Sequence, residues 1–173
     1  MQNQTLAQWI FRGLKLLNLC AKVVLTIFVA LAGLAIITTF SGGKIGAFKM
    51  FSEWRVLAPM LLSGVIHSSA LLLITQQLQL ITQSHIENDP FVPENGVRLK
   101  KIAIYLGIME LSRYFVQVLT GLIIAFAGQP DDGDLSVKIA PNLVAWGAVF
   151  IILLLSQIFK EGARLRKNDQ LTI

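Results

Sequence analysis

The sequence predicts an all-α integral membrane protein, a single bundle of four spanning helices with short loops and a cytoplasmic C-terminal helical tail. Hydrophobic residues make up 54% of the chain and charged residues 14%, whereas soluble domains carry about 25% charge. Three long runs lack Asp, Glu, Lys and Arg, namely 23–43, 56–84 and 139–159, and the run 102–130 holds only two charges. A helix needs about 20 apolar residues to cross a bilayer. We therefore expect one domain, residues 1–173, with spans at about 18–40, 57–81, 102–127 and 140–160 and a tail at 161–173.

The first span follows a basic segment that contains Arg12, Lys15 and Lys22. A cleaved signal peptide also has a basic start, but its apolar core is only about 7–15 residues long. The apolar stretch 23–39 is longer than that. We therefore expect a retained span rather than a processed leader.

Basic residues near the span ends predict the orientation. If both termini lie on the inner side, that side carries ten flanking Lys and Arg residues and the outer side carries four. Positive residues are enriched in cytoplasmic loops. The sequence thus predicts a multi-pass membrane protein with both termini in the cytoplasm, although Lys44, Lys49 and Arg55 in the first outer loop weaken the asymmetry.

Several function classes are disfavoured by what the sequence lacks. The single cysteine, Cys20, can form neither an internal disulfide nor a CxxC redox pair. The net charge of +5 is spread over the span ends and forms no continuous basic stripe, so we expect no direct binding to nucleic acid. Neither a metal cluster nor a nucleophile motif nor a phosphate loop is recognisable. We expect a non-enzymatic protein without a cofactor.

A polar stripe interrupts the third run. Glu110 and Arg113 lie three residues apart, and Tyr114 and Gln117 fall on the same helix face. A lone charge at the bilayer centre costs about 2.5–3.5 kcal/mol on insertion scales, so this face should point into the bundle. His67 lies at a similar depth in the second span, and we expect it to approach Glu110 and Arg113.

Two interpretations of this stripe remain open. It is either a proton or ligand site, or an internal ion pair that fixes helix packing. In the first case the protein would be a small proton-coupled transporter or channel with Glu110 as the coupling carboxylate. Arg113 lies one turn away and would pair with that carboxylate, which opposes this version.

The second loop precedes the third span and carries its own signals. Pro93 suits the first position of a helix, and Glu94 complements a helix N-terminus. We therefore expect a helix to begin here and to continue into the third span. Phe91 is apolar in a loop, so another part of the chain should cover it.

This loop and the tail together resemble a bacterial family, the YoaS-like four-span membrane proteins of unknown function. The resemblance rests on loop residues Asp89, Pro90, Phe91, Glu94, Asn95, Arg98, Leu99 and Ile102, and on tail residues Phe159, Glu161, Gly162, Leu165, Asp169, Leu171, Thr172 and Ile173. Gly96 stands where the pattern favours a polar or basic residue, which predicts a looser helix start.

The resemblance implies a partner, because such proteins are often encoded beside a small Xre/Cro-like helix-turn-helix regulator. The first hypothesis is therefore a regulator that docks this partner on a cytoplasmic face. The candidate docking residues are Asp89, Pro90, Phe91, Glu94, Asn95, Arg98, Leu99, Glu161, Gly162, Leu165, Leu171 and Thr172. The other expected partner is the lipid bilayer, and the sequence leaves a homo-oligomer open.

Overall fold

The computed structural model describes residues 2–40, 54–127 and 141–171. Over these residues it contains four helices, α1 (Gln2–Phe40), α2 (Trp54–Ile86), α3 (Pro93–Ala127) and α4 (Leu143–Leu171). Each helix is long and apolar enough to cross a membrane. The predicted all-α, four-helix membrane fold is therefore confirmed.

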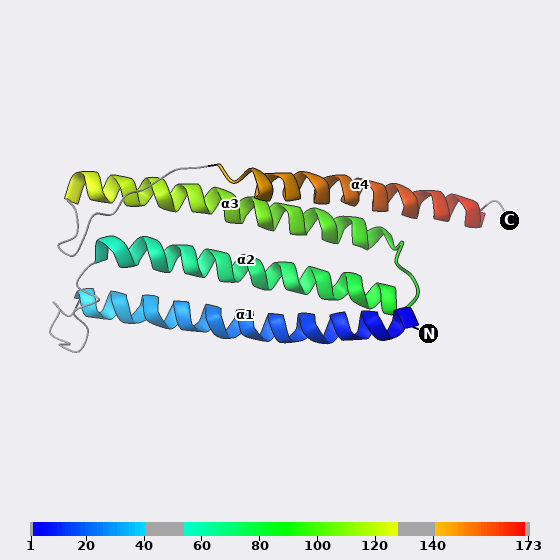
Figure 1. Cartoon of the computed structure of the whole chain (residues 1–173), viewed down its shortest axis with the longest axis horizontal. Coiled ribbons are helices and arrows are strands. Elements are labelled where there is room, and N and C mark those ends of the chain that lie inside the picture. Colours follow the sequence, from blue (N-terminus) through cyan, green and yellow to red (C-terminus); the bar gives the residue numbers. More distant parts are fainter. Residues whose placement is uncertain (1, 41–53, 128–140, 172–173) are drawn as a thin grey trace.

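The helices form an antiparallel bundle in which each one packs chiefly against its neighbours in sequence (Figure 1). α2 and α3 are central, and α1 and α4 lie at the two edges. α4 is offset along α3: it starts beside the middle of α3 and runs past the N-terminal end of α3 (Figure 1). The start of α1 and the end of α4 lie at the same end of the bundle, as two termini on one side of a membrane require.

The helices are longer than the apolar runs that predicted them. α3 starts at Pro93, and the backbone N–H of Asn95 donates to the carbonyl of Val92 at 3.0 Å, so the predicted helix start and its continuation into the span are confirmed. α4 starts at Leu143 because Asn142 caps it, with Oδ1 accepting from the Ala145 N–H at 3.2 Å. The helix also continues into the tail, as far as Leu171.

Polar contacts set the register between α1 and α2. Asn18 Nδ2 donates to Thr75 Oγ1 at 3.0 Å, and both residues are buried. Gln79 Nε2 donates to a backbone carbonyl of α1 at 2.9 Å. Towards the other end, the Phe28 ring occupies the space where a Cβ on Gly64 would lie. Hydrogen bonds and small residues of this kind hold helices together where lipid offers no polar partners.

α2 ends in a Schellman motif around Asn88, whose φ of 60° lies in the left-handed region. The N–H of Asp89 donates to the Ser84 carbonyl at 3.0 Å, and the N–H of Asn88 donates to the His85 carbonyl at 3.2 Å. This turn sets the direction in which the chain leaves α2 toward α3.

We expect Asn88→Val to lower the stability by about 1–2 kcal/mol, because a β-branched residue is strained in the left-handed region. Asn88→Gly should change it little, since glycine adopts this conformation freely. Thermal unfolding of both variants in detergent measures the difference. Equal midpoints for the two variants would show that the turn does not constrain the fold.

Candidate functional site

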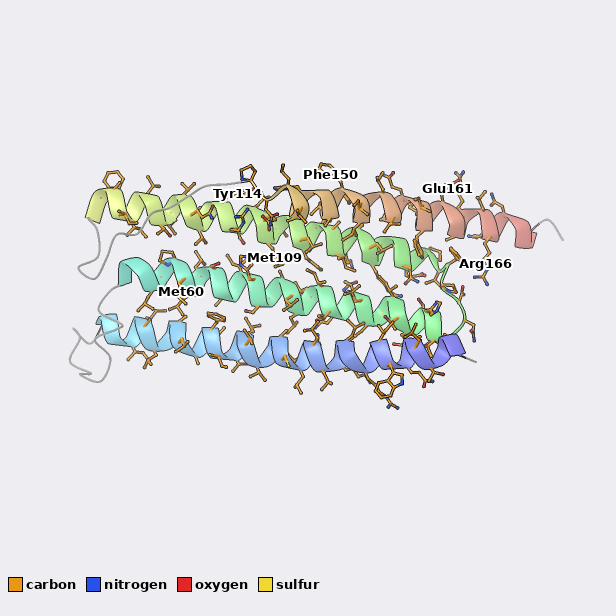
Figure 2. The ribbon with its side chains drawn as sticks, in the orientation of Figure 1. Met60, Met109, Tyr114, Phe150, Glu161 and Arg166 are labelled. Carbon is orange, nitrogen blue, oxygen red and sulfur yellow. The ribbon has the colours of Figure 1, made fainter. Side chains whose placement is uncertain are left out.

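The connection between α2 and α3 packs against the part of α4 that follows its apolar run. The rings of Phe91 and Phe159 stack with centroids 5.7 Å apart. A Cβ on Gly162 would lie 3.6 Å from the Phe91 ring. Arg166 projects toward the connection and forms an ion pair with Asp89 (Figure 2). α4 thus supplies part of the cover predicted for Phe91. We call residues 87–94 together with 159–166 the loop–tail surface.

Asn95 is buried next to this surface and holds the connection in place through its hydrogen bonds. It is only 1% exposed, and its Nδ2 donates to Ser84 Oγ at 2.7 Å and to the Pro90 carbonyl at 2.9 Å. Its Oδ1 accepts from Arg98 Nη1 at 2.8 Å, and the same nitrogen donates to the Leu80 carbonyl. Asn95 and Arg98 were predicted as docking residues. In the structure they join the end of α2, the connection and the start of α3, and their part in docking stays a prediction.

α3 and α4 approach each other closely at Gly96. Ser156 Oγ donates to the Gly96 carbonyl at 2.7 Å. A Cβ on Gly96 would lie 3.1 Å from the Ser156 carbonyl oxygen and 3.3 Å from the Lys160 backbone nitrogen. Because Gly96 has no side chain, the backbones of α3 and α4 can come into contact here. The sequence had suggested a different consequence of this glycine, a looser start of the helix.

The outer part of the loop–tail surface combines apolar and charged side chains. Phe91 is 49% exposed despite its stacking, and Leu165, one turn from Gly162, is 54% exposed. Glu94 is exposed, and Glu161 points away from the bundle, 2.6 Å from Arg164 (Figure 2). These side chains, unlike Asn95, are accessible to a partner.

The remaining predicted docking residues differ in accessibility. Asp89 and Pro90 are partly exposed in the connection, and Leu99 is half-buried in α3. The backbone of Leu171 belongs to α4, but its side chain lies outside the described residues. Thr172 also lies outside them.

The predicted polar stripe holds the start of α4. Arg113 Nε donates to Glu110 Oε2 at 3.1 Å, and its Nη2 lies 3.0 Å from the same oxygen. The Arg113 guanidinium lies 4.8 Å from the centroid of the Tyr114 ring. Asn142, the cap of α4, donates its N–H to Tyr114 Oη at 3.1 Å and points Nδ2 at Glu110 Oε1 at 3.5 Å. Gln117 Oε1 is buried and has no hydrogen-bond partner among the described residues.

His67 lies in α2, where its Nδ1 is 2.9 Å from the Ser63 carbonyl oxygen, one turn back along the same helix. A direct approach of His67 to the ion pair stays a prediction.

Sequence reasoning missed Asn142 and Ser156 as structural residues. Asn142 had a usable signal, because an Asn directly before an apolar run is typical of a helix N-cap. Ser156 had a weaker one, as a small polar residue inside an otherwise apolar run. Neither signal identifies the partner helix.

Comparison with known proteins finds one family. Its model, described as a protein of unknown function (DUF2975), matches residues 46–173. The match extends beyond the loop and tail to include α2, α3 and α4 in full. The comparisons find no match among curated proteins and none among solved structures.

Proposed function

We propose that this chain, which belongs to the DUF2975 family of proteins of unknown function, is a non-enzymatic membrane protein. Its proposed role is to dock a small cytoplasmic helix-turn-helix regulator. The observation that carries this proposal is the loop–tail surface. Two segments about 70 residues apart, which carry the family-like pattern, pack on each other at one end of the bundle.

The surface has the chemistry of a docking site. Exposed apolar side chains, Phe91 and Leu165, lie among charges, the arrangement found where a protein interface has an apolar centre and a polar rim. The stack with Phe159 and the buried Asn95 hold the backbone of the connection in place before any partner arrives. A pre-ordered surface loses less conformational entropy on binding.

The identity of the partner comes from the resemblance to the YoaS-like proteins and their neighbouring Xre/Cro-like regulators. The proposal also places the protein in the bacterial inner membrane with the loop–tail surface in the cytoplasm. Its support is the excess of Lys and Arg on that side, together with the start of α1 and the end of α4 at the same end of the bundle (Figure 1).

The test is crosslinking in native membranes followed by purification of the full chain. Leu165→Asp should abolish recovery of a small helix-turn-helix protein, because a buried carboxylate at an apolar contact lacks a partner. The matched control is Leu6→Asp, since Leu6 is equally apolar and 63% exposed on α1 at the same end of the bundle. Recovery that is equal for both variants and the wild type would refute docking at the loop–tail surface.

A second candidate, a proton-coupled transporter using Glu110, has one supporting observation. The buried Gln117 Oε1 has no hydrogen-bond partner among the described residues and lies one turn from Arg113, so a ligand or proton carrier could satisfy it. Against this, both oxygens of Glu110 face a donor, from Arg113 and from Asn142. A coupling carboxylate must be released during its cycle, and here that release would also loosen the start of α4.

A further inference from the structure

A cleft opens where α4 runs past the end of α3. Its volume is about 580 Å³, and its walls include Pro93 from the first turn of α3 and Gln157 and Lys160 from α4. The cleft forms because α4 extends past the N-terminal end of α3, where Pro93 begins the helix (Figure 1). It lies apart from the stack of Phe91 on Phe159, which uses another side of α4.

The cleft is positively charged. Lys160, Arg164 and Lys167 line it together with a single acid, Glu161. Their spacing of four and three residues places the three cations on one helix face. Glu161 lies 2.6 Å from Arg164 and offsets its charge, so the two lysines supply the net charge. The N-terminal end of α3 forms part of the wall, and Glu94 in its first turn offsets the partial positive charge of that helix end.

The position of the cleft along α4 matches the level of lipid headgroups. The apolar run of α4 ends at Phe159, and the cleft begins within one turn of that point. Phe150, which is labelled in Figure 2, and Leu154 are exposed apolar side chains in the apolar run of α4 that precedes the cleft. A ligand with a phosphate at one end and acyl chains at the other fits both parts of this surface.

We infer that this cleft binds the phosphate of an anionic phospholipid headgroup. Lys160 and Lys167 contact the phosphate oxygens, and the acyl chains lie along the apolar part of α4. Basic pockets at the membrane boundary are suited to such headgroups. The cleft shares Pro93 and most of residues 160–164 with the loop–tail surface. It includes neither Phe91 nor Leu165, so the inference does not depend on the docking of a regulator.

The test is a titration of short-chain phosphatidylglycerol into the full chain in detergent, followed by thermal unfolding. The Lys160→Gln/Lys167→Gln variant should bind about tenfold or more weakly than the wild type, from the typical contribution of each surface Lys. The matched control, Lys100→Gln/Lys101→Gln, removes the same charge from exposed positions of α3 and should bind within about twofold of the wild type.

The controls distinguish the source of the phosphate. Phosphatidylcholine should give no saturable shift, because its headgroup carries no net charge, and glycerol phosphate should bind far more weakly than the lipid. Equal weakening in the two double variants would show unspecific charge attraction and overturn the site. Binding of glycerol phosphate as tightly as phosphatidylglycerol would overturn the assignment to a lipid.

Discussion

Arg113→Ala is expected to destabilise the folded protein by about 2.5–3.5 kcal/mol, the cost of a lone charge at the centre of a spanning helix on insertion scales. The Glu110 side chain is 14% exposed, and Arg113 supplies two of the nitrogens that face its carboxylate. Arg113→Lys should retain most of the stability, because an ammonium group can still reach the carboxylate from the same turn. Membrane yield and thermal unfolding midpoint of the two variants measure the contrast.

A double variant shows whether the unpaired carboxylate is the cause. In Glu110→Gln/Arg113→Gln neither charge remains, so the double variant should be more stable than Arg113→Ala alone. If Arg113→Ala and Arg113→Lys express and unfold alike, the pair does not support the bundle. The transporter hypothesis would then gain support, because an ion pair that is not needed for folding can open and close during a transport cycle.

The architecture of this protein was predictable because it depends on composition over long stretches. Runs such as 56–84 exclude charge so completely that only a spanning helix accounts for them. The pair Glu110 and Arg113 was predictable for a related reason, since residues three apart on a helix are neighbours whatever surrounds them. Pro93 likewise marks the helix start by its own geometry.

The roles of Asn95, Asn142 and Gly96 were not predictable, because each depends on a second segment of the chain. Asn95 was named as a candidate docking residue, yet it is buried and donates hydrogen bonds to Ser84 and Pro90. Asn142 joins α4 to Glu110 across about 30 residues of sequence. Nothing local to these residues indicates how closely the helices approach each other.

Gly96→Ala is expected to destabilise the contact between α3 and α4 by about 1–3 kcal/mol, the usual effect of overpacking. The new methyl group would lie 3.1 Å from the Ser156 carbonyl oxygen and 3.3 Å from the Lys160 nitrogen. Both are backbone atoms, so α4 itself must shift, and the hydrogen bond from Ser156 to the Gly96 carbonyl would lengthen. Thermal unfolding and limited proteolysis of the tail report on the two effects.

Gly107→Ala is the matched control, because Gly107 lies in the same helix and a Cβ there would meet no atom within 4 Å. Alanine is favoured over glycine within a helix by about 1 kcal/mol, so this variant should be as stable as the wild type or more so. If Gly96→Ala is also stabilising, α3 and α4 are not in contact at this level. The loop–tail surface would then lose its support, because Phe159 and Arg166 reach the connection only while α4 lies against α3. The stability of Gly96→Ala is thus a test of the surface on which the proposed docking depends.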